Sequence, residues 1–406
     1  MAEYVNRFTA FSLCKDVFSN IADDLRYIVQ LLSHDNRKPN KEDVFCYACS
    51  RGAIDIVRFM LVDDTLGVGG IQDAMMLAAD MNQVNILKLL LASGRADPNF
   101  ADSELLHSSI LEPNIPTIQT LLSDERVASA VTPQDIAKVA MHGSIELVSI
   151  FFDAFQGDQV DMYAAAITSA CNKDHMHVVQ YVLESIKDFS EELRAQILSP
   201  ALVNILSFEN PIGVRKASEI ALLLLRAGAD PSFDHNAGIY YAATIGHDDV
   251  VEIMLRDPRT DPSDVEDRAY CSAVSQGHLN IVQMLLQDHR VDPMTEYNFA
   301  LREAASRGNE QMLALLLAND RIDPTAFANV ALQAFAESDD ENILNVFLSN
   351  PQTTAAAVRQ TLLYADQVHM VQRLLQDARI DTAAINNSSC KRFDRNSGNS
   401  IGRSTI

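Results

Sequence analysis

Small, polar and apolar residues recur along the chain with a fixed spacing. The glycines at 246, 277 and 308 are 31 residues apart, and a run of small residues precedes each of them. After Gly246 come two apolar pairs, Val250-Val251 and Met254-Leu255, which lie one helical turn apart. Glycine supplies the left-handed residue that ends a helix, and the apolar pairs form one stripe on a following helix. The pattern therefore predicts a unit of two short helices that repeats every 31 residues.

The same frame extends in both directions along the chain. It places Asp174, Gly143, Asn82 and Gly52 at earlier glycine positions and Asp339 at a later one, and a shortened copy follows near residue 365. A degenerate copy at the start brings the total to about twelve units. Because a pair of short helices cannot bury its apolar faces alone, the units must stack. Proline ends a helix or starts a turn, and an Asp-Pro step separates units at 97–98, 230–231, 261–262, 292–293 and 323–324.

These motifs resemble those of the ankyrin repeat family. The likeness is carried by Gly246-His247 with Val250-Val251, by Gly277-His278, and by the run from Ala227 to Asp230, Ala-Gly-Ala-Asp. The resemblance implies an all-α, ankyrin-type α-solenoid of about twelve stacked helix-turn-helix repeats with short loops or β-hairpin fingers.

The sequence also departs from the family pattern. The Thr-Pro-Leu-His opening survives only as Leu106-His107, Arg-x-Asp as in Arg290-Val-Asp292 often replaces Gly-Ala-Asp, and the period is 31 residues. These departures favour short loops over fingers.

The frame predicts the following organisation. We expect a degenerate N-terminal capping repeat at residues 1–40 and a first block of ankyrin repeats at 41–193. An expanded repeat with an insertion follows at 194–231, then a second block of repeats at 232–381 and a disordered tail at 382–406. Between the glycine positions Asp174 and Lys216 there are 42 residues. We assign the surplus to 207–213, which is either a binding loop or a tolerated insertion and which divides the solenoid into two cooperative halves.

The resemblance also implies a concave surface that recognises proteins. This surface is expected to contain the residues that precede each glycine and the loop that precedes each first helix. The predicted partner-binding residues are Arg51, Met81, His142, Phe233, His235, Thr244, Ile245, Glu266, Ser275, Gln276, Glu296, Tyr297, Ser306, Arg307 and Phe327.

Composition narrows the class of partner. The formal net charge of -23 argues against binding the phosphate backbone of a nucleic acid and favours neutral or basic protein surfaces. The start of the chain has no signal-peptide pattern, no apolar stretch is long enough to span a membrane, and the six cysteines form no disulfide framework. We expect an intracellular, cytoplasmic, soluble monomer.

Several motifs could suggest chemistry, but each has a structural explanation in the frame. We expect Cys46 and Cys49 to pack in a first helix, and His175 to occupy the Gly-His position, so that His175 and His177 are not a metal pair. We expect Gly67 to Gly70 to form a long turn, and Asp248-Asp249 to stabilise a helix N-terminus. The sequence thus predicts no catalytic, metal-binding or cofactor-binding residue, and no enzyme.

Three functions follow from these observations. The leading one is a protein-protein interaction module or scaffold. The second is a substrate adaptor for a ubiquitin ligase or similar machine, docked through residues 6–32, and the third is a secreted effector or cryptic enzyme with a pocket beside 207–213. The final Ser404-Thr-Ile406 also fits the carboxylate motif that PDZ domains capture.

Overall fold

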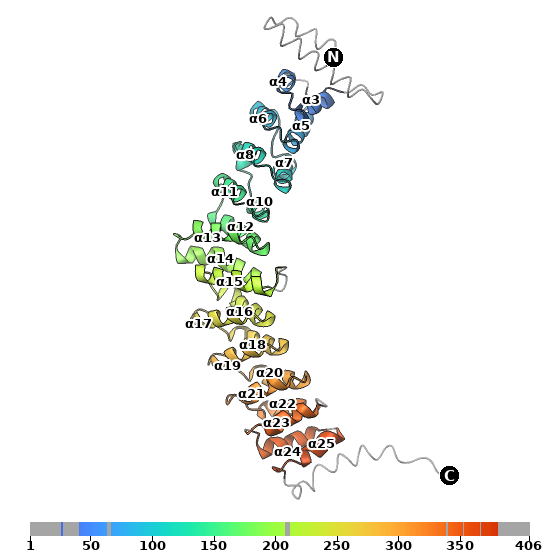
Figure 1. Cartoon of the computed structure of the whole chain (residues 1–406), viewed down its shortest axis with the longest axis vertical. Helices are drawn as coiled ribbons and strands as arrows, with labels where there is room; N and C mark the ends of the chain where they lie inside the picture. Colours follow the sequence, from blue (N-terminus) through green and yellow to red (C-terminus); the bar gives the residue numbers. More distant parts are fainter. Residues whose placement is uncertain are drawn as a thin grey trace, which may run out of the picture. The chain divides into compact units, whose positions relative to one another are not determined.

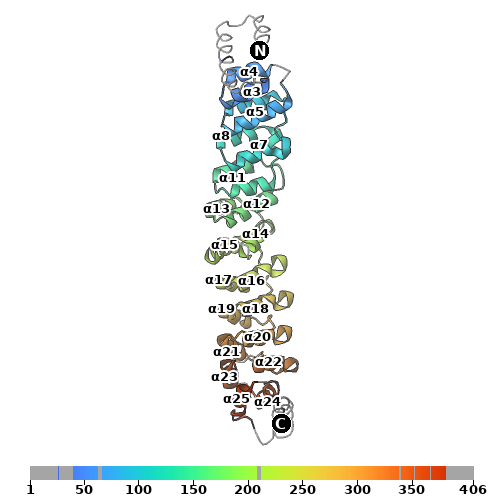
Figure 2. The same cartoon turned by 90° about the vertical axis from the view of Figure 1, so that its right-hand side faces the viewer.

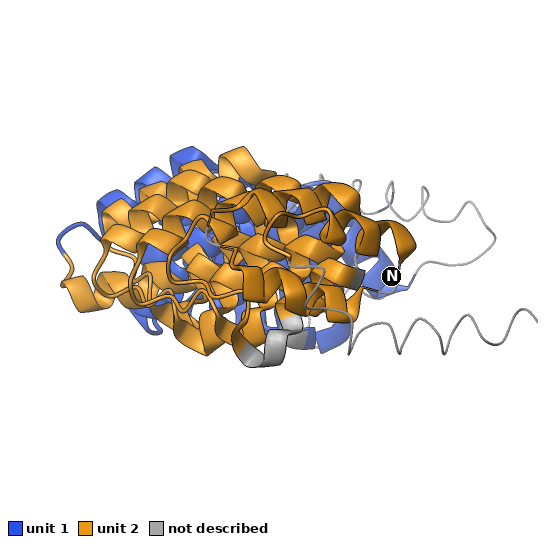
Figure 3. Cartoon of the chain, turned by 90° about the horizontal axis from the view of Figure 1, so that it is seen from below, with its two compact units in different colours: residues 1–188 blue, residues 189–406 orange. Residues whose placement is uncertain are grey.

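The computed structural model describes residues 26, 40–62, 66–207, 212–337, 340–351, 353–365 and 367–380. The chain divides into two compact units, Met1–Asp188 and Phe189–Ile406, which are coloured separately in Figure 3. Within each unit, successive helices form antiparallel pairs that stack on the next pair (Figure 1). In each pair we call the helix before the glycine position the first helix and the one after it the second helix.

Unit 1 contains five helix pairs in its described residues. They are α3 (Lys41–Ser50) with α4 (Ile54–Leu61), α5 (Val68–Asp80) with α6 (Val84–Ser93), α7 (Phe100–Leu111) with α8 (Ile115–Leu122), α10 (Pro133–Ala140) with α11 (Ile145–Ala154), and α12 (Gln159–Asn172) with α13 (Met176–Ser185). A single turn, α9 (Glu125–Ala128), follows α8.

Unit 2 contains six helix pairs in its described residues. They are α14 (Glu191–Leu206) with α15 (Val214–Ala227), α16 (Phe233–Ile245) with α17 (Asp248–Arg256), α18 (Asp264–Gln276) with α19 (Leu279–Gln287), α20 (Thr295–Ser306) with α21 (Glu310–Leu317), α22 (Ala326–Glu337) with α23 (Glu341–Ser349), and α24 (Ala355–Tyr364) with α25 (Val368–Leu375). In Figure 2 the first helices α16, α18, α20 and α22 form one column and their second helices form another.

The fold class is an all-α solenoid, as the sequence predicts. No strand forms in the part of the chain that the structure describes, so the connections there are short loops and not β-hairpin fingers. The apolar pairs of the frame form the core: Val250, Val251 and Met254 of α17 are fully buried, and so are their counterparts in the neighbouring second helices. From α16 to α22, the first helices pack on one another more extensively than the second helices do.

The glycine position of the frame adopts the predicted left-handed conformation. Gly246 and Gly277 end α16 and α18 with φ of 96° and 78°. Asn82 and Asp174, which replace glycine in unit 1, are also left-handed, with φ of 55° and 58°. Asn and Asp are among the non-glycine residues that tolerate this conformation best, which explains why they are the replacements.

Where a histidine follows the glycine position, it connects its pair to the preceding one. The Nε2–H of His278 donates to the carbonyl of Thr244 at 3.1 Å, and His175 makes the same contact with Met141 at 2.8 Å. The ring of His278 covers Gly246 so closely that a Cβ there would lie 2.7 Å from it. Glycine is therefore required at 246 for its backbone conformation and for the space that the histidine fills.

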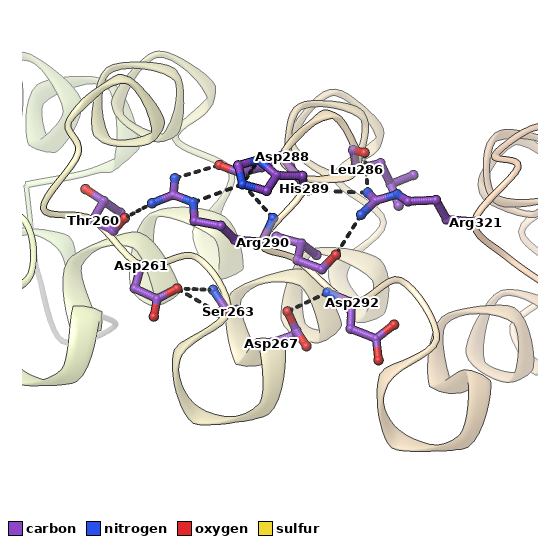
Figure 4. Close-up of polar contacts among 11 residues, drawn as sticks. Thr260, Asp261, Ser263, Asp267, Leu286, Asp288, His289, Arg290, Asp292 and Arg321 are labelled. Atoms are coloured by element: carbon purple, nitrogen blue, oxygen red, sulfur yellow. Dashed lines mark hydrogen bonds and ion pairs between the residues drawn. The ribbon is translucent and has the colours of Figure 1, made fainter.

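A second connection uses the arginine of the Arg-x-Asp motif. Arg290 donates from Nε and Nη2 to both carboxylate oxygens of Asp288, at 3.0 and 2.6 Å, and from Nη1 to the carbonyl of Thr260 in the preceding pair (Figure 4). Arg321 reaches the carbonyls of Val291 and Leu286 in the same way. Arg95, Arg126 and Arg379 make equivalent contacts with the pair before their own. We call these contacts arginine clamps.

The clamps satisfy backbone carbonyls that short loops leave without partners near the ends of the second helices. In three clamps a carboxylate also orients the guanidinium by bidentate pairing: Asp288 with Arg290, Asp124 with Arg126, and Asp377 with Arg379. Hydrogen bonds from Arg290 hold the pKa of the Asp288 carboxyl below its ordinary value. A motif that departs from the family pattern thus has a structural role between repeats.

The expectation for Gly67 to Gly70 is wrong. Gly67 is the N-cap of α5, which starts at Val68, and Gly69 and Gly70 lie inside that helix. Gly70 is buried, and a Cβ there would come 2.7 Å from Cγ of Glu42 on α3. The glycines permit close packing of α3 on α5, and they do not form a long turn.

The expanded repeat also differs in detail from the prediction. Lys216, which the frame places at a glycine position, lies in the first turn of α15, and the left-handed residue is Gly213 with φ of 85°. Much of the extra length of this repeat is helical, because α14 has 16 residues and α15 has 14. Phe208 to Pro211, the centre of the predicted insertion, lie outside the described residues.

Other predicted features lie outside the described residues as well. Of the N-terminal capping repeat at 1–40, only Arg26 and Asn40 are described. The tail at 382–406, with the possible PDZ motif ending in Ile406, and the glycine-position residue Asp339 are not described. The predicted domain boundaries and the adaptor hypothesis therefore stay predictions.

Replacing Gly246 by Ala tests the double requirement at this position. We expect the free energy of unfolding to fall by about 1 to 3 kcal/mol, because alanine is strained in the left-handed region and its Cβ displaces His278. The measurement is urea denaturation followed by circular dichroism. Gly69→Ala is the control, since Gly69 lies in α5 with open space around it, and helix propensity favours a gain of about 0.5 to 1 kcal/mol. Equal effects of the two substitutions would contradict this explanation.

The arginine clamps give a second test. Arg290→Ala is expected to destabilise the fold by about 1 to 2 kcal/mol, because it leaves the carbonyl of Thr260 and the carboxylate of Asp288 without their donor. Arg256→Ala removes an exposed i,i+4 pair with Glu252 and should change stability by about 0.5 kcal/mol or less. Both free energies of unfolding are measured in the same denaturation assay. Equal values for the two variants would show that the clamp does not stabilise the stacked repeats.

Candidate protein-binding surface

Three first helices of unit 2 begin with a left-handed turn. In α16 the residues Asp234, His235 and Asn236 have φ of 53° to 54°, and the same conformation occurs 31 residues later at 265–267 and again at 296–298. A left-handed residue other than glycine costs about 1 to 2 kcal/mol, so three in succession need strong support from their surroundings.

The third residue of each turn supplies part of this support, because its side chain is buried against the next Asp-Pro step. Oδ1 of Asn236 accepts the backbone N–H of Asp261 at 2.8 Å, and Oδ1 of Asp267 accepts that of Asp292 at 3.0 Å (Figure 4). Asn298 instead donates from Nδ2 to the carbonyl of Asp323 at 2.9 Å.

The Asp of each Asp-Pro step folds the loop that leads into the turn. Asp261 Oδ1 accepts the backbone N–H and the hydroxyl of Ser263, and Asp230 does the same with Ser232. Each turn is therefore fixed by its own repeat and by the following one.

The predicted loop residues are presented by these turns. His235, Glu266 and Glu296 are exposed, and Phe233 and Tyr297 have 41% and 65% of their surface exposed. Phe327 lies in α22, and its side chain is outside the described set. The turns bring the loop candidates of α16, α18 and α20 to the same end of neighbouring first helices, which pack on one another.

The residues before the glycines lie at the other end of the same helices. Ser275, Gln276 and Arg307 line a shallow hollow of about 570 Å³ around Gly277 and Gly308. Ser306, which precedes Arg307, is also exposed. These four residues are accessible to a partner, as a binding surface requires.

Thr244 corrects the prediction, because it is not accessible. Only 8% of its surface is exposed: its hydroxyl donates to the carbonyl of Tyr240 at 2.7 Å and lies 2.6 Å from Oγ of Ser272. Its carbonyl accepts the His278 hydrogen bond described above. Thr244 connects α16 to α18, and the adjacent Ile245 is half-buried.

In unit 1 the predicted partner-binding residues that precede the glycine positions are exposed, and one of them is apolar. Arg51, Met81 and His142 all lie on the surface at the ends of α3, α5 and α10. The Arg51 guanidinium lies 5.6 Å from the ring centre of Tyr47. The three predicted residues of unit 1 thus occupy one repeat position, with a different chemical character in each repeat.

The motifs weighed as chemical sites have structural roles. Cys49 is fully buried in α3, and Sγ of Cys46 lies 3.6 Å from the carbonyl of Gly70. Burial raises the pKa of the Cys46 thiol to about 11 and raises that of Cys49 further. Asp248 and Asp249 lie in the first turn of α17, where Asp248 accepts a hydrogen bond from Asn280. This placement agrees with packing and capping.

The shifted pKa values likewise trace to burial or to ion pairs within the fold. Burial lowers the pKa of His247, whose Nδ1 lies 2.7 Å from Oγ of Ser218, and burial raises that of Asp267. Within the described ranges, no group of three or more His, Cys, Asp or Glu side chains is placed to hold a metal ion. None of the helices described is both long and apolar enough to cross a membrane.

The left-handed turns are a feature that the sequence analysis missed. An Asn or Asp recurs six residues after the Asp of the last four Asp-Pro steps, at 236, 267, 298 and 329, whereas Ser103 holds this position after the step at 97–98. This spacing is visible in the sequence and could have indicated a buried polar residue that forms a hydrogen bond with the next repeat. Its left-handed backbone could not have been inferred, because that depends on a hydrogen bond to a residue 25 positions away.

The stacked helix pairs define a helical repeat protein whose repeats present short turns at the surface. Residues 19–102 match the family model described as ankyrin repeats (3 copies). This match confirms the resemblance noted in the sequence and supports an ankyrin repeat protein. No curated protein sequence matches the chain. Ankyrin repeats generally mediate protein-protein interactions, and ankyrin repeat proteins are typically non-catalytic.

The buried carboxyl of Asp267 leads to a pH-dependent prediction. Because its folded pKa is raised, the folded protein binds more protons than the unfolded chain, and stability falls as the pH rises through the folded pKa. Asp267→Asn keeps an acceptor for the Asp292 N–H but does not titrate. We expect it to raise the free energy of unfolding at neutral pH by about 0.5 to 1 kcal/mol and to reduce the loss between about pH 4 and pH 7.

The reciprocal substitution is the matched control. Asn236→Asp places a carboxylate beside Asp264, to which Asn236 now donates at 2.8 Å, so it should destabilise the fold and steepen the loss with rising pH. Both variants are compared with the unchanged chain by urea denaturation at several pH values. If both variants are less stable than the unchanged chain at neutral pH, the ionised carboxylate of Asp267 stabilises the fold and the prediction is wrong.

Proposed function

We propose that this protein is a non-catalytic interaction module or scaffold that binds partner proteins through the ends and turns of its first helices. The observation that carries the proposal is a row of exposed apolar residues in unit 1. Met81, Leu111 and Met141 lie 30 residues apart at the ends of α5, α7 and α10, with 55%, 72% and 43% of their surfaces exposed. We call these three residues the apolar ridge.

The ridge differs from the scattered apolar exposure of any protein surface. Its members belong to three consecutive first helices, and α7 contacts both α5 and α10. Ile145, which begins α11 four residues after Met141, is also exposed. A row of large apolar side chains in successive repeats is typical of a binding surface, since removing it from water favours association by roughly 25 cal/mol per Å² buried.

Polar residues flank the ridge as they flank the centre of many interfaces. Arg51 precedes it on α3, and His142 adjoins Met141. Both can donate hydrogen bonds at the edge of an apolar contact. The arrangement of an apolar row with polar neighbours supports binding.

A scaffold role predicts that loss of the ridge removes partners without unfolding the chain. The variant Met81→Gln/Leu111→Gln/Met141→Gln should lose at least about tenfold in the amount of each ridge-dependent partner recovered by affinity purification and quantitative mass spectrometry. Its circular dichroism and melting temperature should match those of the unchanged protein, since the replaced side chains are exposed.

A matched control replaces three exposed apolar residues that form no row. Leu193→Gln/Leu363→Gln/Val368→Gln changes unit 2 by the same number of exposed side chains and should retain the partners. An unchanged partner set in the ridge variant would reject this surface as the binding site.

A further inference from the structure

We propose that the left-handed turns of unit 2 form a second docking surface, for a basic segment of a partner protein that carries apolar residues among its Lys and Arg side chains. We call residues 230–236, 261–267 and 292–298 the turn edge. It extends the proposed function to unit 2 and does not depend on the apolar ridge of unit 1.

The turn edge carries one sign of charge. Its three segments contain eight carboxylates and no Lys or Arg: Asp230, Asp234, Asp261, Asp264, Glu266, Asp267, Asp292 and Glu296. Some of them are engaged in the fold, as described for Asp230, Asp261 and Asp267. The side chains of Asp234, Glu266 and Glu296 are exposed, and no hydrogen bond or ion pair engages their carboxylates within the described residues.

Of the turn-edge carboxylates, Asp230 forms an ion pair with Arg259 at 4.0 Å. Arg268 and Arg302, which follow the second and third turns in the sequence, form no ion pair with Asp234, Glu266 or Glu296. The guanidinium of Arg268 lies flat against Tyr240, 3.7 Å from the ring centre. Arg302 donates to the backbone carbonyl of Glu296 at 2.9 Å and not to its carboxylate. A cationic partner would therefore meet carboxylates whose charge is not already paired.

Each turn also exposes one large apolar side chain. These are Phe233, Val265 and Tyr297, and Val265 has 51% of its surface exposed. A pocket of about 200 Å³ lies between the first two turns, lined by Asp234, His235, Tyr240, Tyr241, Asp264 and Arg268 among others. Tyr240 already stacks with Arg268, whereas the exposed ring of Phe233, next to Asp234 in the sequence, suits the aliphatic stem and charged head of a Lys or Arg side chain of the partner.

The turns are held in place before any partner arrives. The buried side chains of Asn236 and Asp267 tie each turn to the next Asp-Pro step, so little backbone freedom remains to be lost on binding. β-Branched Val265 in a left-handed conformation is costly, and it persists because the surrounding hydrogen bonds fix the turn. This rigidity keeps the exposed apolar and acidic side chains in constant positions.

Charge complementarity selects the occupant. A nucleic acid or an anionic membrane surface would be repelled by the turn edge, since both present negative charge. A purely apolar segment would leave the exposed carboxylates without partners. The combination that satisfies both features is a protein segment in which basic and apolar residues are interspersed.

The test measures binding of fluorescein-labelled peptides to the full chain by fluorescence anisotropy at about 0.15 M salt. The probe peptide interleaves Arg and Lys with Leu and Phe. A second peptide replaces Leu and Phe by Ser and Gly, and a third replaces Arg and Lys by Glu. We expect the probe peptide to bind at least about tenfold more tightly than either of the others.

Two variants of the turn edge separate its features. Asp234→Asn/Glu266→Gln/Glu296→Gln removes the charge, and Phe233→Ser/Val265→Ser/Tyr297→Ser removes the apolar side chains; each should weaken binding of the probe peptide at least about tenfold. Glu192→Gln/Glu310→Gln/Glu341→Gln makes the same change of charge at exposed helix starts of unit 2 and should leave binding within about twofold. Circular dichroism and urea denaturation check that each variant is folded.

Several outcomes would overturn the proposal. Equal binding of the peptide without apolar residues, or equal loss in the helix-start control, would show general attraction to an acidic protein. Loss of peptide binding in the apolar-ridge variant would place the contact in unit 1. If the apolar-ridge variant still binds the probe peptide but loses its cellular partners, the result would support two independent surfaces. Failure of the turn edge alone would leave the ridge proposal intact.

Discussion

A helix pair in this chain has apolar side chains that it cannot cover by itself, and this constraint governs the rest of the structure. The buried pairs of the second helices and the small residues of the first helices are covered only when the next pair stacks on them. Short loops follow from this stacking, because successive pairs must stay close. The loops in turn leave backbone groups near the helix ends that need partners from another repeat.

Two sets of polar contacts meet that need in unit 2. The arginine clamps satisfy carbonyls at the ends of second helices. In the left-handed turns, buried Asn236 and Asp267 each accept an N–H of the next Asp-Pro step, and buried Asn298 donates to a carbonyl there. Each contact joins one repeat to its neighbour in the sequence, so polar and apolar interactions stabilise the same interfaces. Stability then depends on neighbouring repeats together, as expected for a protein of this architecture.

The sequence predicts the fold well because the frame is local. The 31-residue spacing locates helix pairs, and the left-handed Asn82 and Asp174 show that the frame holds where glycine is absent. Prediction is weaker where the outcome depends on distant contacts. The helical Gly67–Gly70 segment is set by packing against Glu42, and the burial of Thr244 by a neighbouring repeat. The clamps are equally hidden, because the acceptors of Arg290 and Arg321 include carbonyls 30 residues earlier in the chain.

The same separation between frame and surface explains how one repeat can carry different recognition chemistry. Positions that contact the next repeat hold small, apolar or clamping residues, whereas the positions beside them are free to vary. At the ends of first helices this freedom gives Met81 and Leu111 in unit 1 but Gln276 and Arg307 in unit 2. At the turns it gives carboxylates interspersed with Phe233, Val265 and Tyr297. Because Phe233, Val265, Tyr297 and the carboxylates of Asp234, Glu266 and Glu296 are exposed, we expect each surface to accept substitutions while the stacked repeats that support it stay unchanged.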